Sequence, residues 1–161
     1  MAEPVLRRLV ATSGTADAES LRPMRLGRPL RRRLEEFVAS GYPNEVCGLL
    51  VGREVSRVTR VERVTLARNL AGARRADRYT LDPRDFLEAD DAARRDGLEI
   101  VGIWHSHPDH PARPSRTDFE AAWEGYTYVI LSVGAEGVVG VKAWRLEGLA
   151  FLEQPIEEVP S

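Results

Sequence analysis

The chain has 161 residues and a mass of 18.0 kDa, the size of one ordinary domain. Its 43% hydrophobic and 30% charged residues exclude a disordered chain, and its net charge of −2 gives no basic surplus for nucleic acid. No apolar run reaches the roughly 20 residues that span a membrane, and arginines interrupt the stretch 5–11 too strongly for a signal peptide. We therefore expect a cytoplasmic protein that binds neither nucleic acid nor membrane.

Residues 1–23 show no sustained apolar periodicity and are predicted to form a flexible tail, so the folded domain is expected to span 24–161. Within this domain, three segments carry apolar residues three and four positions apart, which predicts helices. Pro29 suits the first turn of the first helix, and Asp82 followed by Pro83 suits the start of the second. The predicted helices cover residues 29–40, 83–96 and 117–124.

Strands are predicted where apolar residues run together or alternate with polar ones. Segment 55–66 alternates throughout and is expected to form one long or two short strands, partly exposed to solvent. Pro108 is expected to end a buried strand, and the prolines within 106–114 predict an irregular loop. Helices scattered between strands indicate one mixed α/β domain. The predicted strands cover residues 46–51, 55–66, 78–81, 98–105, 126–133, 138–146 and 151–159.

The histidines of this chain are clustered in a way that suggests a metal site. All three lie between positions 105 and 110, while a single cysteine excludes a cysteine-based zinc cluster. In an extended segment, alternate side chains face the same way, so the imidazoles of His105 and His107 project to one side. Asp118, in the first turn of the third predicted helix, is a candidate third ligand. Two histidines and one carboxylate can hold one zinc ion and leave a fourth position open for water.

Each of these residues also has a simpler structural explanation. Ser115 and Asp118 form a Ser-x-x-Asp pattern, so the serine can serve only as a helix N-cap and the aspartate only as a partner of the helix dipole. His110 lies in a proline-rich loop and is expected to be a solvated loop residue. Cys47 and Trp104 lie in apolar runs and are expected in the core, the cysteine as a small buried residue and not as a nucleophile.

Two segments of the chain resemble the signature of the JAMM (MPN+) zinc metalloprotease family. The first is His-Ser-His-Pro at 105–108 followed by Pro-Ser-Arg-Thr-Asp at 114–118, in which ten residues separate the second histidine from the aspartate, as in the family. The second is Pro-Asn-Glu-Val-Cys-Gly-Leu-Leu-Val-Gly at 43–52, which is similar to the strand that carries the family's catalytic glutamate in small prokaryotic JAB-domain members. The resemblance covers about residues 24–152.

This resemblance implies a fold, a set of roles and a substrate class. The implied fold is a curved mixed β-sheet flanked by helices, similar to the cytidine deaminase core. His105, His107 and Asp118 would hold one zinc ion, Glu45 would act as general base and later as proton donor, and Ser115 would hydrogen-bond the oxyanion. The implied activity is that of a metallopeptidase or isopeptidase. Because the compact prokaryotic members act on small ubiquitin-like sulfur-carrier proteins, the implied cut lies after a C-terminal Gly-Gly of such a partner.

Two other functions remain open at this point. A non-catalytic MPN-type scaffold usually lacks the metal ligands, whereas all three candidate ligands are present here. RadC-like proteins have a similar His-x-His-Pro stretch, but they typically carry Asn between the histidines, where this chain has Ser106.

Overall fold

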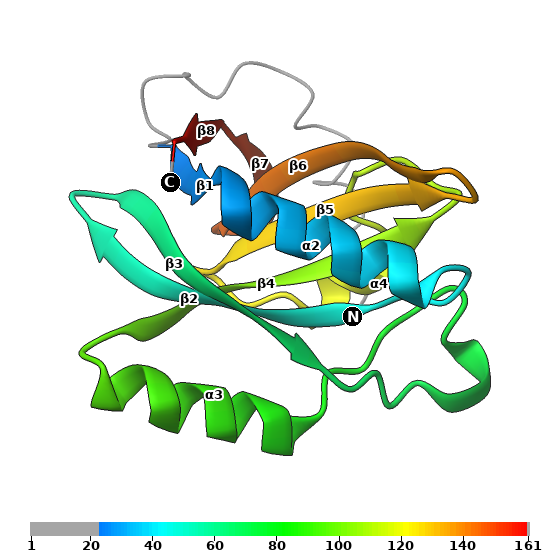
Figure 1. Ribbon diagram of the computed structural model, residues 1–161, viewed down its shortest axis with the longest axis horizontal. Coiled ribbons are helices and arrows are strands. Elements are labelled where there is room, and N and C mark those ends of the chain that lie inside the picture. The colour runs from blue at the N-terminus through cyan, green and yellow to red at the C-terminus, as the bar shows by residue number, and fades with distance from the viewer. Residues whose placement is uncertain (1–22, 161) are drawn as a thin grey trace.

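A curled eight-stranded sheet is the frame of the computed structural model, which describes residues 23–160 (Figure 1). Most neighbouring strands run antiparallel, but β4 and β5 are parallel, as are β1 with β3 and β1 with β8, so the sheet is mixed. In the order in which they lie side by side, the strands are β7 (Ala150–Gln154), β6 (Gly137–Glu147), β5 (Thr127–Gly134), β4 (Glu99–Pro108), β2 (Cys47–Val55), β3 (Val58–Ala67), β1 (Met24–Gly27) and β8 (Ile156–Val159).

Two longer helices flank this sheet from opposite sides, as Figure 1 shows. They are α2 (Arg28–Gly41) and α3 (Pro83–Arg95), and two short elements, the 3-10 helix η2 (Gly72–Arg74) and α4 (Arg116–Ala121), lie in the connections. The predicted α/β domain with a curved mixed sheet flanked by helices is therefore confirmed. The predicted tail at 1–23 lies outside the described residues except for Pro23.

Helix α2 packs on the sheet through the residues whose spacing predicted it. Leu34 and Val38 are completely buried, and Phe37 stacks on Trp104 of β4 with ring centroids 5.7 Å apart. The indole N–H of Trp104 donates to the carbonyl of Thr65 at 3.0 Å, which satisfies its polar atom inside the core. The expected core position of Trp104 is thus confirmed, and the tryptophan anchors the strand that carries the histidines.

The start of α3 also follows the sequence signals, whereas α4 is shorter than predicted. The Asp82 carboxylate accepts the Arg84 backbone N–H at 2.9 Å, and Pro83 occupies the first turn. Helix α4 ends at Ala121 instead of 124. The predicted strand at 78–81 was wrong, because among the described residues of this segment only Leu81 makes a bridge, with Asn69.

The predicted strand at 55–66 begins only at Val58, because a tight turn separates it from β2. Ser56 and Arg57 form this turn with φ angles of 50° and 65°, a region that normally favours glycine or asparagine. Neither residue type signals such a turn, so the alternating pattern predicted a strand that included both residues. Val55 therefore belongs to β2, which extends beyond the predicted end at 51.

Strand β4 continues through Pro108, so the predicted loop at 106–114 was wrong for its first three positions. The Ser106 N–H donates to the Val46 carbonyl at 2.9 Å, and Pro108 pairs with Val133 of β5. A proline is tolerated here because it is the last residue of the strand, where it removes little from the ladder. Both histidines are consequently held by regular sheet structure.

The predicted final strand at 151–159 is in fact two strands that pair with opposite edges of the sheet. Strand β7 pairs with β6 and β8 pairs with β1, and only Pro155 separates them. Two consecutive strands can reach both edges only if the sheet curls until those edges approach one another. Buried hydrogen bonds cross the inside of this curl: the Thr127 hydroxyl donates to Gln154 at 2.8 Å, and the Gln154 amide donates to Thr59 at 3.2 Å.

Candidate metal centre

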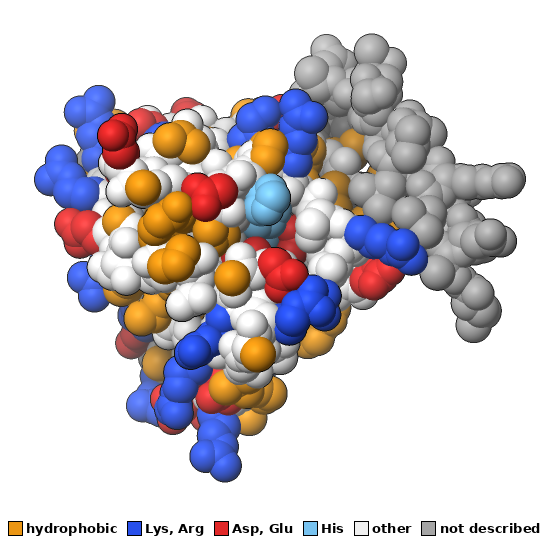
Figure 2. Space-filling model, turned by 90° about the vertical axis from the view of Figure 1, so that its right-hand side faces the viewer, with side chains coloured by type: hydrophobic (Ala, Val, Ile, Leu, Met, Phe, Trp, Pro, Cys, Tyr) orange, Lys and Arg blue, Asp and Glu red, His pale blue; other side chains and the backbone are white. Residues whose placement is uncertain are grey.

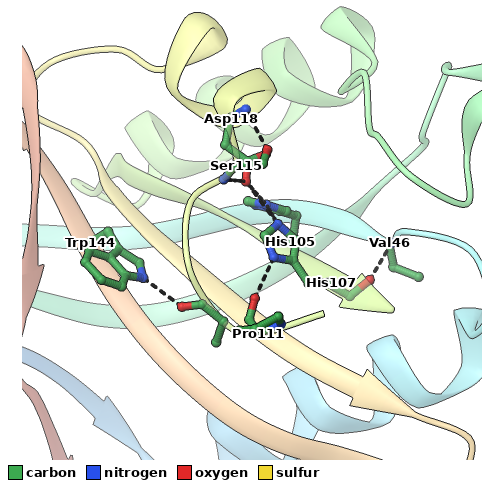
Figure 3. Close-up of polar contacts among 9 residues, drawn as sticks. Val46, His105, His107, Pro111, Ser115, Asp118 and Trp144 are labelled. Carbon is green, nitrogen blue, oxygen red and sulfur yellow. Dashed lines mark hydrogen bonds and ion pairs between the residues drawn. The ribbon is translucent and has the colours of Figure 1, made fainter. Parts of the chain in front are cut away.

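Both histidines lie near the end of β4, and their rings project to the same side, as the alternation along a strand predicts. His105 pairs with Cys47 of β2 and with Ile130 of β5, while His107 pairs with Ser132 of β5. Their Nε2 atoms are 3.1 Å apart (Figure 3). His105 is completely buried and His107 is 7% exposed. The sheet therefore fixes two convergent nitrogen atoms at one point.

Helix α4 brings Asp118 to the same point. Ser115 is its N-cap: the serine hydroxyl accepts the Asp118 N–H at 3.0 Å, and the Asp118 carboxylate accepts the Ser115 N–H at 2.8 Å, which completes a capping box. The same carboxylate oxygen, Oδ2, lies 3.0 Å from Nε2 of His107 and 3.2 Å from Nε2 of His105 (Figure 3). Helix capping and metal binding are therefore compatible roles for these residues, because the cap orients the Asp118 carboxylate.

The spacing of the three atoms suits one metal ion. Two ligands that each lie about 2.0–2.2 Å from a tetrahedral zinc ion are about 3.4 Å apart, and the three separations here are 3.0, 3.1 and 3.2 Å. The Nδ1 atom of His107 hydrogen-bonds the Pro111 carbonyl at 2.8 Å, which it can do only as the donor. In a neutral imidazole, this leaves Nε2 as the atom with a free lone pair.

The charge states of these residues also suit a cation. Burial lowers the pKa of His105, which keeps the ring neutral and able to act as a ligand. Burial alone would raise the pKa of Asp118, but the two histidines and the Ser115 N–H outweigh it and hold that pKa below its usual range. Burial alone would lower the pKa of His107, but Asp118 and the Pro111 carbonyl outweigh it and raise that pKa, so a cation competes with a proton at this ring. Once both imidazoles are neutral, they and the ionised carboxylate are a suitable donor set for a divalent ion.

Glu45 is a second carboxylate at the same site. It lies just before β2, and atoms of Glu45, His105 and His107 lie within 4.8 Å of one another. Asp118 Oδ2 lies 3.0 and 3.2 Å from the two ring nitrogens, so both carboxylates are candidates at this site and Asp118 is the one in direct contact with the histidines. The Oε2 atom of Glu45 is buried and has no hydrogen-bond partner within the described part of the chain. A buried polar atom of this kind is expected where water or an ion completes the site.

The environment of Glu45 moves its pKa into the range that proton transfer needs. Burial, assisted by the charges of Asp118 and Asp77, raises the pKa of Glu45 from 4.5 to about 7, while His107 and Arg78 act in the opposite direction. A carboxyl group with such a pKa can accept a proton and return it near neutral pH.

This pKa shift predicts a pH-dependent cost to stability in metal-free protein. Because the folded state binds the Glu45 proton more tightly than the unfolded state, Glu45 contributes stability at low pH that is lost as the pH rises from about 4.5 to about 7. Glu45→Gln removes this loss. Urea unfolding at each pH gives the free energy of unfolding of Glu45→Gln minus that of wild type. This difference should be larger at pH 8 than at pH 5, which means that the variant gains stability relative to wild type as the pH rises. An equal difference at both pH values would contradict the burial of an ionisable Glu45.

Other residues considered in the sequence do not join the site. His110 is exposed. Cys47 is buried, and burial raises the pKa of its thiol to about 12, so it remains protonated at neutral pH, as expected for a core residue. Tyr79 was missed: its ring stacks on His105 with centroids 4.4 Å apart. No periodicity or spacing around Tyr79 signals this contact, because a loop brings the residue to the site.

Figure 2 shows the face of the molecule on which a histidine side chain is exposed, with acidic side chains close by and hydrophobic side chains to one side. Among the described helices, none is both long and apolar enough to cross a membrane.

Comparisons with known proteins identify the family of this chain. The family model described as prokaryotic homologs of the JAB domain matches residues 27–147, which include all five candidate site residues. A desampylase of Haloferax volcanii is 40% identical over 124 residues, covering 76% of this chain and 85% of that protein. A CysO-cysteine peptidase of Mycobacterium tuberculosis is 34% identical over 120 residues, covering 73% and 79% of the two chains.

A third relative and two solved structures extend these similarities. A probable TtuB-protein conjugate cleaving protease of Thermus thermophilus is 38% identical over 105 residues, covering 65% of this chain and 63% of the relative. The solution structure of protein DSY2949 from Desulfitobacterium hafniense matches with a TM-score of 0.77 at 30% identity, over 86% of this chain and 94% of its own. That of a protein from Salinibacter ruber matches with a TM-score of 0.65 at 38% identity, over 84% and 91%. This chain therefore belongs to the prokaryotic homologs of the JAB domain, the small prokaryotic branch of the JAMM family that its sequence resembles.

Proposed function

We propose that this protein is a zinc-dependent peptidase that releases a small ubiquitin-like sulfur-carrier protein from an amino acid or a lysine side chain, by cutting after the carrier's C-terminal Gly-Gly. The observation that carries the proposal is the convergence of the His105, His107 and Asp118 ligand atoms within 3.2 Å of one another, with Glu45 beside them. The names of the three relatives, which refer to a desampylase, a TtuB–protein conjugate and a CysO–cysteine, support the substrate class.

In this proposal, His105, His107 and Asp118 hold the zinc ion. Bound zinc would supply Lewis-acid chemistry and would lower the pKa of the attacking water to about 7. Glu45 accepts a proton from the attacking water, whose oxygen forms a bond to the carbonyl carbon. Glu45 then returns this proton to the leaving amine while the carbon–nitrogen bond breaks. The position of Glu45 within 4.8 Å of the histidine ligand atoms supports this role.

Ser115 is proposed to assist the same step through its hydroxyl proton. Its oxygen accepts the Asp118 N–H, but this bond does not use the hydroxyl proton, so the side chain retains a donor. We propose that this donor binds the negative oxygen that develops on the carbonyl. A Gly-Gly tail suits the site because a segment without side chains can approach the end of a strand closely in an extended form.

Ser115→Ala is expected to change two separate quantities. Loss of the N-cap should lower the free energy of unfolding by about 1 kcal/mol, and loss of an oxyanion donor should lower kcat by about 100-fold or more. Asp82→Ala, which removes the N-cap of α3 and an ion pair with Arg68 at 3.8 Å, is the control and should lower stability without this loss of kcat. If kcat falls only together with zinc affinity, Ser115 acts only through the cap that orients Asp118.

The activity itself can be tested with defined adducts. Zinc-loaded protein is incubated with a carrier ending in Gly-Gly that is joined to cysteine by a peptide bond or to a lysine side chain by an isopeptide bond, and the products are identified by mass spectrometry. We expect a cut after the second glycine and none when Ala-Ala replaces Gly-Gly. Uncut adducts in the presence of tightly bound zinc would contradict the proposal and favour a non-catalytic scaffold.

A further inference from the structure

The backbone of Glu45 is not held by the sheet in the way that the backbone of the histidines is. At the N-terminal end of β2, the ladders with β4 and β3 begin with the pairs Cys47–His105 and Cys47–Ala67. Glu45 precedes both ladders. Val46 is still tied to β4, because its N–H donates to the Ser106 hydroxyl at 2.8 Å and its carbonyl accepts the Ser106 N–H at 2.9 Å. The position of Glu45 must therefore depend on contacts from elsewhere in the chain.

These contacts come from residues 69–81, which we call the site loop. The Glu45 N–H donates to the Arg75 carbonyl at 2.6 Å, and the Glu45 carbonyl accepts the Asn69 side-chain amide at 3.1 Å. Both backbone polar groups of Glu45 are thus paired with the site loop. The same loop carries Tyr79, whose ring stacks on His105, so one loop contacts both the candidate base and a candidate ligand.

Asn69 closes the site loop with every hydrogen bond that its side chain can form. Besides Glu45, its amide nitrogen donates to the Arg78 carbonyl at 3.1 Å. Its amide oxygen accepts the N–H groups of Ala71 at 3.0 Å and Thr80 at 2.9 Å. Two donors and two accepted bonds are the full capacity of an asparagine side chain, and no other residue of this length offers both. An aspartate here would still accept the N–H groups of Ala71 and Thr80. Its second oxygen would face the carbonyl oxygens of Glu45 and Arg78 with no proton to donate.

We propose that Asn69 is a positioning residue for Glu45: it links the closed site loop to the carbonyl of the catalytic carboxylate and so fixes where that carboxylate lies relative to the water and the metal ligands. The predicted effect on turnover rests on the proposed function. The prediction that Asn69 fixes the position of Glu45 does not. A general base displaced by about 1 Å can lose about 100-fold in rate, and changes to residues that orient a metal site typically cost about 10–100-fold.

The structural part is tested by hydrogen exchange at the Glu45 amide in the zinc-loaded full chain. Asn69→Ala and Asn69→Asp should both speed this exchange at least about tenfold, because the amide donates to a carbonyl of the released loop. Thr80→Ala is the matched control, since it changes an exposed side chain of the same loop and keeps the backbone N–H that Asn69 accepts. The aspartate variant keeps the size of the side chain and provides the test if the alanine variant does not fold. Unchanged exchange at Glu45 in the folded variants would overturn the inference.

The functional part is tested by combining each Asn69 variant with Glu45→Gln. In the wild-type background, Asn69→Asp should lower kcat about 10–100-fold while KM and zinc content stay within about twofold. In the Glu45→Gln background, the same change should lower kcat by less than about twofold, because the group on which it acts is already lost. An equal loss in both backgrounds would overturn positioning through Glu45. If wild-type protein cuts no adduct, the proposed function fails, and the exchange measurement alone still decides whether Asn69 holds Glu45.

Discussion

Glu45→Gln is expected to lower turnover of a carrier adduct at least about 100-fold while leaving the zinc content unchanged. Glutamine keeps the size of the buried side chain and removes its ability to accept and return a proton. The metal should stay because the carboxylate in direct contact with the two histidines is that of Asp118, at 3.0 and 3.2 Å. Single-turnover cleavage assays and metal analysis of the same purified samples measure both quantities.

Glu120→Gln is the matched control for this change. Glu120 lies on α4 close in sequence to Asp118, but its side chain is exposed and pairs with Arg116 at the surface. Removing this charge should leave kcat within about twofold, since exposed ion pairs contribute little. A Glu45→Gln protein that still cuts at the wild-type rate would refute its role as general base, and one that loses zinc would make Glu45 a ligand instead.

Asp118→Asn is expected to weaken zinc binding more than 100-fold and to abolish cleavage at micromolar zinc. Changes to residues that merely orient metal ligands cost about 10–100-fold in affinity, so loss of a charged ligand should exceed that range. Asparagine keeps the shape of the side chain and an oxygen that can accept the Ser115 N–H, so the capping box of α4 should survive. Isothermal titration with zinc and a competing chelator measures the affinity.

Asp82→Asn provides the control for a buried aspartate at a helix start. Asp82 is 6% exposed and caps α3 through the Arg84 N–H, but it is not among the residues that meet the histidines. Its replacement should leave zinc affinity unchanged. If Asp118→Asn binds zinc as tightly as wild type, Glu45 must complete the ligand set, as its position within 4.8 Å of the histidine atoms would permit.

The convergence of the three candidate ligands was predictable because local geometry determines it. Alternation along a strand sets His105 and His107 on one side, and a helix start sets Asp118 toward its own N-terminus, where the capping box holds it. Glu45 could not be found in this way, because it precedes β2 and the chain returns it to the histidines only through the β2–β4 pairing. Only the family resemblance identified it.

The features that the sequence missed depend on contacts that no local pattern encodes. The turn at Ser56 and Arg57 uses left-handed backbone without glycine or asparagine. The split of 151–159 into β7 and β8 depends on the curl of the whole sheet. Asn69 lies outside the predicted elements and Tyr79 in a predicted short strand, and their partners Glu45 and His105 are distant in sequence. Long-range packing decided the split of the last strand and the contacts of Asn69 and Tyr79.

X-ray absorption at the zinc edge of the loaded protein tests the central claim most directly. Ligation by His105, His107 and Asp118 predicts nitrogen and oxygen neighbours at about 2.0–2.2 Å, with two imidazole rings and no sulfur. The Asp118→Asn protein should lose this spectrum at the same zinc concentration. A zinc–sulfur distance of about 2.3 Å would point to Cys47 and contradict the site, as would a folded wild-type protein that binds no zinc.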